Sequence, residues 1–228
     1  VNASALQAVP KDKGLIIANP NCSTIQMVVA LEALRPFGLK EVQVATYQSV
    51  SGSGQKGIKE LKVQVADYQS GKEAQSEFYD QPIVFNVLPA IDRLVEGGHC
   101  YEEVKMIEET RKIMGLPKLR VFATTARVPT YNCHCESVTV QLDKEITRDE
   151  AMARLREMTG IALQQEDDHR QFPTPRQVTG QRNVHVARVR LPYGESRSDR
   201  LQFWIVADNL RKGAATNAVQ ILATLASA

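Results

Sequence analysis

The spacing of apolar residues is the feature that most constrains how this chain folds. Short runs rich in β-branched residues alternate with longer segments in which apolar residues recur every three to four positions. Such alternation predicts a mixed sheet with helices packed on it. The expected strands span residues 14–18, 41–50, 83–88, 119–126, 136–142, 184–191 and 202–207. The expected helices span residues 25–34, 58–68, 101–114, 148–158 and 213–225.

Composition and charge narrow the class of partner. A hydrophobic content of 43% excludes a disordered or fibrous chain, and a formal net charge of +2 gives no electrostatic reason to expect nucleic acid or an anionic membrane. No apolar run approaches the roughly 18 residues of a membrane helix, and no signal peptide is recognisable. We therefore expect a small-molecule partner, a cytoplasmic location and four free cysteine thiols. A first residue of Val1 rather than Met is typical of a fragment or a processed product.

A glycine-rich loop follows the second expected strand. Residues 52–57 fit the dinucleotide-binding pattern G-x-G-x-x-G between a strand and a helix. The strand before a true dinucleotide turn is a dry apolar run, whereas this one carries Gln43, Thr46 and Gln48. We favour a strand-to-helix loop whose glycines allow positive φ, and the alternative of a loop that touches a ligand held mainly elsewhere stays open.

Cys22 stands where a turn of Asn, Pro and Asn gives way to a helix. Free backbone N–H groups and the positive end of the helix favour a thiolate there, which points to nucleophilic chemistry. The alternative is structural: Asn21 or Ser23 caps the helix, and Cys22 is a small buried apolar residue. The local sequence leaves both interpretations open.

His134 is the candidate proton carrier for Cys22. A cysteine and a histidine far apart in sequence form the usual pair of nucleophile and proton shuttle. A zinc site at Cys133, His134 and Cys135 is not expected, because on a strand the two thiols face one way and the imidazole the other. The alternative for His134 is a solvated histidine at a strand end.

Three segments taken together resemble the aspartate-semialdehyde dehydrogenase family. They are Asn-Pro-Asn-Cys-Ser-Thr at 19–24, Thr-Tyr-Gln at 46–48 with Ser-Gly-Ser-Gly at 51–54, and Arg-Val-Pro at 127–129 with His134. Further matches lie at 109–112, 173–176 and 208–215, so the resemblance spans almost the whole chain. It implies an α+β fold with a mixed, largely antiparallel sheet and helices on one face, similar to the C-terminal domain of glyceraldehyde-3-phosphate dehydrogenase-like enzymes.

The resemblance also implies a reaction, the NADPH-dependent reduction of 4-phospho-L-aspartate to L-aspartate 4-semialdehyde with release of phosphate. This step serves lysine, methionine and threonine biosynthesis. By carry-over from the family, Cys22 forms a thioester and His134 shuttles the proton, with no metal. The implied substrate-binding residues are Gln48, Glu109, Lys112 and Arg127, and the implied contacts to the nicotinamide end of NADP are Ser51, Gly52 and Asn209. Glu109 and Lys112 also fit a surface ion pair on one helix face.

The family places a nucleotide-binding domain upstream of the matching part. The resemblance therefore implies that residues 1–228 form a substrate-binding and dimerisation domain, that the chain is a homodimer, and that it is inactive alone. The C-terminal helix, about 211–226, is expected to pack on the other domain. Two competing interpretations are a catalytically inactive paralogue that acts as a dimerisation module, and another acyl-phosphate or acyl-CoA reductase of the same architecture.

Overall fold

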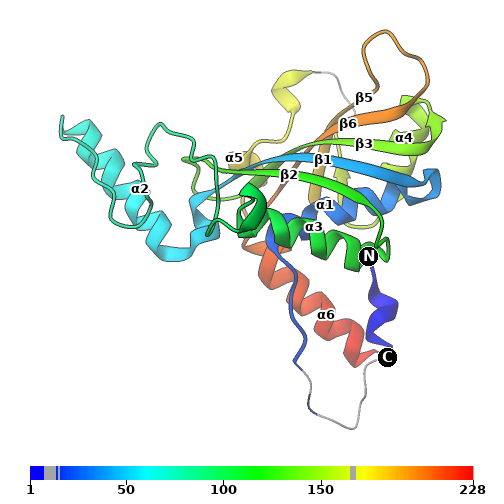
Figure 1. The fold of residues 1–228 in the computed structure, drawn as a ribbon, viewed down its shortest axis with the longest axis horizontal. Coiled ribbons are helices and arrows are strands. Elements are labelled where there is room, and N and C mark those ends of the chain that lie inside the picture. Colours follow the sequence, from blue (N-terminus) through cyan, green and yellow to red (C-terminus); the bar gives the residue numbers. More distant parts are fainter. Residues whose placement is uncertain (8–13, 15, 165–167, 228) are drawn as a thin grey trace.

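The protein is built around one six-stranded sheet. The computed structural model describes residues 1–7, 14, 16–164 and 168–227. The strands are β1 (Leu39–Gln48), β2 (Arg120–Arg127), β3 (His134–Ile146), β4 (Ile161–Leu163), β5 (Val184–Arg190) and β6 (Ser198–Ala207), in the spatial order β2-β1-β3-β6-β5-β4 (Figure 1). Three of the five pairings are antiparallel, and the parallel ones are β1 with β2 and β4 with β5. The expected mixed, largely antiparallel sheet is confirmed.

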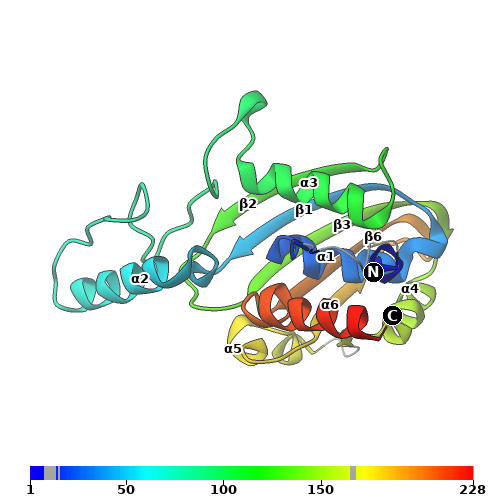
Figure 2. The ribbon, with the colours of Figure 1, turned by 90° about the horizontal axis from the view of Figure 1, so that it is seen from below.

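Three helices cover one face of this sheet. They are α1 (Cys22–Leu34), α3 (Tyr101–Met114) and α4 (Arg148–Glu157), and Figure 2 shows all three on the same side. Almost every residue of α1 is buried, because the helix is apolar all round and lies between its two neighbours and the sheet. Met27 and Leu31 pack in the core with sheet residues such as Val140 and Phe203, each contributing roughly 1.5–3 kcal/mol. The short α5 (Pro175–Val178) packs on the opposite face through Val178.

An arm extends from the end of β1. It begins with a single 3₁₀ turn, Val50–Ser53, and continues as α2 (Gly54–Gln69), which projects away from the sheet (Figure 1). Glu60 on α2 accepts hydrogen bonds from the backbone N–H groups of residues 77, 78 and 79. One turn later, the side-chain oxygen of Gln64 accepts the N–H groups of Ile83 and Val84 at 2.9 and 3.0 Å. These two side chains hold the returning segment against α2.

Two expected strands are wrong. Residues 83–88 do not form a strand, because Gln64 takes two of their N–H groups, Phe85 has a φ of 53°, and only Leu88 makes an isolated bridge. Within 14–18, residue 15 lies outside the described residues, and the others form no strand. Ile16 is fully exposed there, and no described strand lies beside it to supply backbone partners.

The C-terminal segment lies outside the sheet layers. The expected helix is present as a π-helical turn, Arg211–Ala215, followed by α6 (Thr216–Ala226). No described residue of α6 is buried, and its apolar Val219 and Leu222 are exposed. Among the described residues, no helix has the length and apolarity that crossing a bilayer requires.

Candidate active site

Four strand ends meet at one edge of the sheet. The last residue of β1, Gln48, pairs with both Arg127 at the end of β2 and His134 at the start of β3. His134 in turn pairs with Ala207 at the end of β6. The N-terminus of α1, where Cys22 is the first helical residue, belongs to the same region. Residues far apart in sequence therefore converge here.

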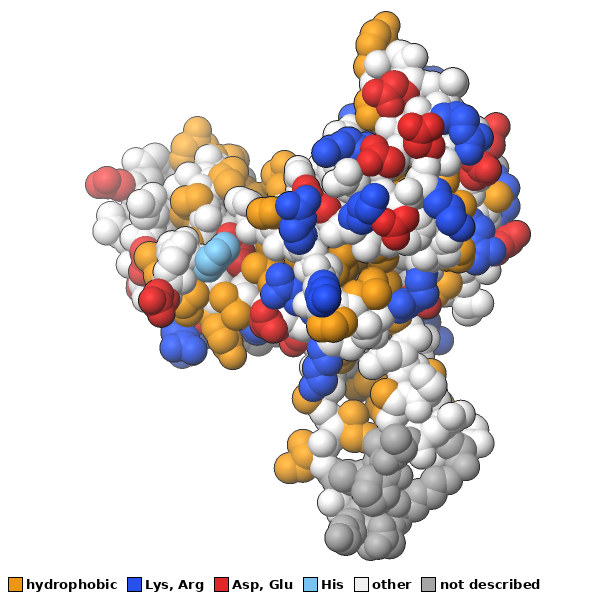
Figure 3. Space-filling view, turned by 45° about the vertical axis from the view of Figure 1, so that its right-hand side comes forward, with side chains coloured by type: hydrophobic (Ala, Val, Ile, Leu, Met, Phe, Trp, Pro, Cys, Tyr) orange, Lys and Arg blue, Asp and Glu red, His pale blue; other side chains and the backbone are white. Residues whose placement is uncertain are grey.

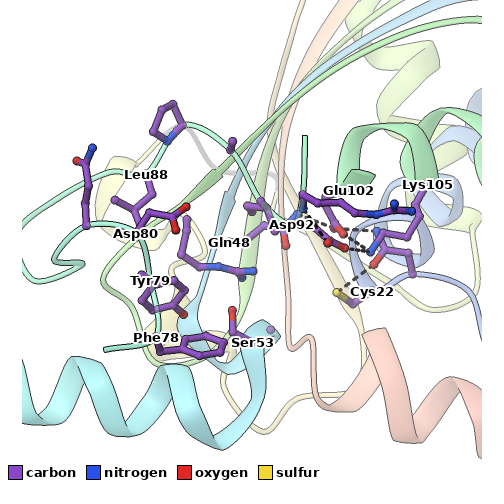
Figure 4. Close-up of a pocket in the computed structure, with 18 residues that line it drawn as sticks. Cys22, Gln48, Ser53, Phe78, Tyr79, Asp80, Leu88, Asp92, Glu102 and Lys105 are labelled. Carbon is purple, nitrogen blue, oxygen red and sulfur yellow. Dashed lines mark hydrogen bonds and ion pairs between the residues drawn. The ribbon is translucent and has the colours of Figure 1, made fainter. Parts of the chain in front are cut away.

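A cavity of about 700 Å³ opens at this edge (Figure 4). Cys22, Gln48, Gly52 and Arg127 all line it, as the resemblance implies for residues of one site. The segment held by α2 forms another wall, and Figure 4 shows Phe78, Tyr79 and Asp80 across the cavity from Cys22. The rest of the lining comes from Asn21, Ser53, Gln81, Leu88, Pro89, Ala90, Ile91, Asp92, Arg93, Glu102 and Lys105.

Cys22 is the accessible cysteine of the four. It is partly exposed, whereas Cys100, Cys133 and Cys135 are buried, and all four are free thiols as expected. Asn21 makes no side-chain cap on α1, so the expectation that Asn21 caps the helix is wrong. The sequence analysis favoured a thiolate at Cys22, but in this chain the protonated thiol is the favoured form near pH 7. Burial, reinforced by the Glu102 carboxylate, raises the pKa of the Cys22 thiol to about 11 and outweighs the helix end.

Alkylation tests this description of Cys22. We expect iodoacetamide to label Cys22 far faster than the three buried cysteines, because only Cys22 is reachable. Since the pKa is raised, the thiolate fraction is small at pH 7, and the labelling rate should climb about tenfold per pH unit between pH 7 and 10. Peptide mass mapping gives the rate at each cysteine. A rate that levels off by pH 8, or equal labelling of all four, would contradict this prediction.

Arg127 and Gly52 fit against each other. Arg127 is 6% exposed, and its Nη1 donates to the carbonyl oxygen of Ser49 at 2.7 Å. A Cβ on residue 52 would lie 2.7 Å from Nη1 of Arg127 and 3.0 Å from Cε1 of His134, so only glycine fits. At Gly57 a Cβ would lie 2.7 Å from the carbonyl oxygen of Val50. Gly52 and Gly57 thus have packing reasons, and of these three glycines only Gly54, with a φ of 73°, has the positive φ that the favoured strand-to-helix interpretation expected.

His134 is completely buried, so the interpretation as a solvated histidine is wrong. Its Nδ1 accepts the backbone N–H of Ser49 at 3.1 Å. Burial and the positive charge of Arg127 lower the pKa of His134 to about 3, which keeps the imidazole neutral near pH 7. It lies behind Gly52 rather than on the cavity wall.

A carboxylate and an ammonium group that the sequence analysis missed occupy the cavity. Glu102 on the first turn of α3 accepts hydrogen bonds from Gln48 at 2.9 Å and Asn21 at 2.8 Å. Lys105 lies 2.8 Å from its other oxygen and 3.6 Å from Asp92 (Figure 4). Burial acts to raise the pKa of Glu102, but hydrogen bonds from Lys105, Asn21 and Gln48 hold that pKa below its usual value. Glu102 is therefore an anion in the cavity.

Glu109 and Lys112 are not in this cavity. They lie farther along α3 and line a separate cavity of about 350 Å³. Glu109 contributes indirectly, because its carboxylate accepts the backbone N–H of Asn21 at 2.8 Å and so holds the turn before Cys22. A glutamate followed three residues later by a lysine occurs twice on α3, at Glu102 with Lys105 and, seven residues later, at Glu109 with Lys112. The sequence analysis assigned the second pair to the substrate. Two turns separate the copies, so helical periodicity alone does not distinguish them.

The three residues expected at the cofactor differ in their surroundings. Gly52 faces the cavity, whereas Ser51 and Asn209 are each 3% exposed and hydrogen-bonded to each other.

At the neighbouring Cys-His-Cys sequence, Cys133 has a φ of 69° and precedes the strand, and its sulfur lies 3.5 Å from Thr179 Oγ1. Within the described ranges, no group of three or more His, Cys, Asp or Glu side chains could hold a metal ion.

Comparison with known proteins gives a consistent assignment. Residues 31–212 match the family model described as semialdehyde dehydrogenase, dimerisation domain. The chain belongs to the semialdehyde dehydrogenase family. Its curated relatives include the aspartate-semialdehyde dehydrogenase of Legionella pneumophila, 47% identical over 90% of this chain and 59% of the relative. That of Aquifex aeolicus is 45% identical over 92% of this chain and 62% of the relative. The resemblance seen in the sequence is thereby confirmed.

Solved structures agree with this membership of the family. Aspartate semialdehyde dehydrogenase II of Vibrio cholerae superimposes with a TM-score of 0.93 at 42% identity, over 100% of this chain and 66% of that chain. A second structure of that enzyme, complexed with ASA, has a TM-score of 0.88 at 43% identity, over 93% of this chain and 62% of that one. The chain spans about three fifths of the length of the curated relatives named above.

Proposed function

We propose that this chain is the substrate-binding and dimerisation domain, residues 1–228, of an aspartate-semialdehyde dehydrogenase. The proposed reaction is NADPH-dependent reduction of 4-phospho-L-aspartate to L-aspartate 4-semialdehyde with release of phosphate, in lysine, methionine and threonine biosynthesis. One observation carries the proposal: a cysteine at a helix N-terminus shares one cavity with a buried arginine, a carboxylate and a lysine. The complete enzyme is here this chain joined to a nucleotide-binding domain.

The charges of the cavity complement an amino-acid substrate that carries a phosphoryl group. Arg127 forms no ion pair within the described part of the chain, so a substrate carboxylate can take its planar fork in two hydrogen bonds. Glu102 offers a carboxylate to the substrate ammonium group, and Lys105 a positive charge to phosphate oxygens. Gln48, held by Glu102, orients the acyl group. Glu102 and Lys105 thus replace Glu109 and Lys112 in the proposed site.

The chemistry proposed for Cys22 is covalent catalysis. The sulfur of Cys22 attacks the acyl carbon, the bond to phosphate breaks, and phosphate leaves with the electron pair and with the proton of the thiol. When bound, NADPH supplies the hydride that reduces the resulting thioester. Collapse of the thiohemiacetal then breaks the C–S bond, releases the aldehyde and returns the thiolate of Cys22. His134, which lies behind Gly52, transfers the proton to and from the reacting oxygen.

The experiment that tests the proposed function is an assay of the complete enzyme. Aspartate semialdehyde, phosphate and NADP should give NADPH, followed by its absorbance. Glu102→Gln should weaken the use of this substrate more than that of an analogue without the amino group, because Glu102 is assigned to the ammonium. Equal effects on both would favour another acyl-phosphate reductase, and no turnover at all would favour an inactive dimerisation module.

Cofactor binding is assigned mainly to the other domain. Gly52 lines the cavity and carries no side chain, which fits a close approach of the nicotinamide end of NADP to the backbone next to Ser51 and Asn209. The exposed apolar side of α6 gives that domain a surface to pack on, since Val219 and Leu222 are 64% and 65% exposed.

The 228-residue chain alone is therefore expected to bind NADPH only weakly, with a Kd on the order of millimolar or above. The physical reason is that the chain reaches one end of the cofactor and offers no dinucleotide turn for the pyrophosphate. Calorimetric titration measures the affinity. Micromolar binding would show that the glycine loop at 52–57 is a dinucleotide-binding turn after all.

The proposed homodimer uses the sheet face that the main helices leave open. Tyr47 and Phe122 on this face are 40% and 55% exposed, and the Tyr47 ring lies 5.7 Å from that of Trp204. Exposed aromatic side chains gathered on one face are typical of protein interfaces. Elsewhere, Figure 3 shows acidic and basic side chains interspersed, without a large area of one sign on the face in view.

The four free thiols fit the reducing cytoplasm, which we propose as the location.

A further inference from the structure

A buried polar cluster lies at the ends of β1, β3 and β6, which are neighbours in the sheet. It consists of Ser49 and Ser51 after β1, Cys133 and His134 at the start of β3, and Asn209 after β6. Ser49, Cys133 and His134 are wholly buried, and Ser51 and Asn209 are each 3% exposed. Buried side chains that hydrogen-bond to one another are held in one arrangement, so the cluster determines the orientation of the His134 ring.

Asn209 is the centre of the cluster. Its Oδ1 accepts the backbone N–H of Cys133 at 2.9 Å, and the hydroxyls of Ser51 at 3.1 Å and Ser49 at 3.2 Å. The bond to Cys133 matters for the backbone, because Cys133 is a non-glycine residue with a φ of 69°, a conformation that is strained for a residue with a side chain. Asn209 therefore holds the strained residue immediately before His134.

The contact between Ser49 and His134 decides where the imidazole proton sits. The backbone N–H of Ser49 points at Nδ1 of His134 at 3.1 Å, and the hydroxyl of Ser49 lies 3.2 Å from the same atom. A backbone N–H can only donate, so Nδ1 must carry the lone pair. In a neutral imidazole the proton is then on Nε2.

Nε2 is buried beside Gly52. It has no hydrogen-bond partner among the described residues, and it lies 3.1 Å from the point where a Cβ on Gly52 would be. Gly52 lines the cavity, and Nη1 of Arg127 adjoins the same point. A buried donor without a partner is unfavourable, and a substrate oxygen within hydrogen-bond distance of Nε2 would satisfy it.

The charged groups facing His134 are Arg127 and Glu102. Burial and Arg127 both oppose protonation of the ring and so lower its pKa, whereas Glu102 favours protonation and acts against them. The imidazole consequently stays neutral over the pH range in which the enzyme would work, and its tautomer is the property that the neighbours control.

We infer that Asn209 is a positioning residue which, through Ser49 and Cys133, holds His134 in the tautomer protonated on Nε2. His134 then meets the substrate as a hydrogen-bond donor to the oxygen of the acyl group, and it does not begin the reaction by taking the proton of Cys22. The identity of that oxygen rests on the proposed function, whereas the tautomer is independent of turnover.

The tautomer is measured directly by long-range ¹H–¹⁵N NMR of the imidazole groups in the 228-residue chain. The chain has four histidines, and the signal absent from His134→Gln identifies residue 134. We expect the pattern of a neutral ring protonated on Nε2 at every pH from about 5 to 8, because the pKa of His134 is about 3. A ring protonated on Nδ1, or an imidazolium that titrates near pH 6.5, would overturn the inference.

The role of Asn209 is tested by Asn209→Ala with Asn217→Ala as a matched control. Asn217 lies on α6 and bonds to Asn19 and Lys212, away from His134. We expect Asn209→Ala alone to change the His134 signals, and in the complete enzyme to lower kcat on the order of 10- to 100-fold with little change in KM. Unchanged NMR signals and unchanged kcat would overturn the assignment.

A conservative variant separates positioning from folding. Asn209→Asp is isosteric, keeps an acceptor oxygen for Cys133 and both serines, and is favoured in its neutral form by burial. It should retain the Nε2–H pattern even if Asn209→Ala does not fold, and loss of that pattern would count against the inference. If the wild-type enzyme proves inactive while the NMR pattern is as expected, the proposed function fails and the tautomer assignment stands.

Discussion

Cys22→Ala in the complete enzyme is expected to abolish turnover while the melting temperature stays close to that of the wild type. The loss is complete because the proposed reaction passes through a bond to the sulfur, and no other thiol lines the cavity. Stability changes little, because Cys22 is partly exposed and the hydrogen bond from its thiol to Asn21 Oδ1 is weak, at 3.7 Å. The NADPH assay and a thermal melt measure the two quantities.

Cys100→Ala is the matched control for this result. Cys100 is 2% exposed and its sulfur lies 3.1 Å from the hydroxyl of Thr125, below the α3 N-terminus. Its replacement should lower the melting temperature and leave the assay largely unaffected, the reverse of Cys22→Ala. Appreciable turnover by Cys22→Ala, with the fold intact, would remove Cys22 from the role of nucleophile.

Arg127→Lys should lower kcat/KM roughly 100-fold, or about 3 kcal/mol of transition-state stabilisation. One edge of the guanidinium is already committed, because Nη1 donates to the carbonyl oxygen of Ser49 at 2.7 Å. A lysine keeps the positive charge but has one ammonium group, so it cannot bond Ser49 and grip a carboxylate with a planar fork at once. Steady-state kinetics of the complete enzyme measure the effect.

Arg120→Lys is the control for this substitution. Arg120 begins the same strand, β2, at its far end, is largely exposed, and pairs with Glu41 across the sheet. Exposed ion pairs contribute about 0–1 kcal/mol, so Arg120→Lys should behave as the wild type does. If the two variants have the same kinetics, Arg127 does not bind the substrate.

The elements of the fold were largely predictable from the sequence. Helix 101–114 was expected at the bounds it has, and β1, β3 and β6 were expected within a few residues, because their apolar periodicity is decided locally. The polar end of β1 was also visible in the sequence. Its helix-facing residues change from Val42 and Val44, in the core, to Thr46 and Gln48, at the site.

The errors share a physical cause. Residues 83–88 have the composition of a strand, but the side chain of Gln64 takes the hydrogen bonds that a neighbouring strand would need. Glu109 and Lys112 were chosen over Glu102 and Lys105 because both pairs lie on one face of α3, and only the docking of α3 beside β1 places the first pair in the cavity. The local sequence pattern shows neither the hydrogen bonds that Gln64 makes nor the docking of α3 beside β1.

The sequence by itself determined the α+β class, the position of Cys22 where a turn meets a helix, and the family, since each depends on residue types at short, fixed spacing. Tertiary structure alone decided the protonation of the site. The pKa of Cys22 and the tautomer of His134 depend on burial and on Glu102, Arg127 and Ser49, which other segments bring within a few ångströms. The electrostatic energy between two groups depends on the distance between them and on how far water is excluded. For groups on different segments, both are set only when the fold brings the strand ends together.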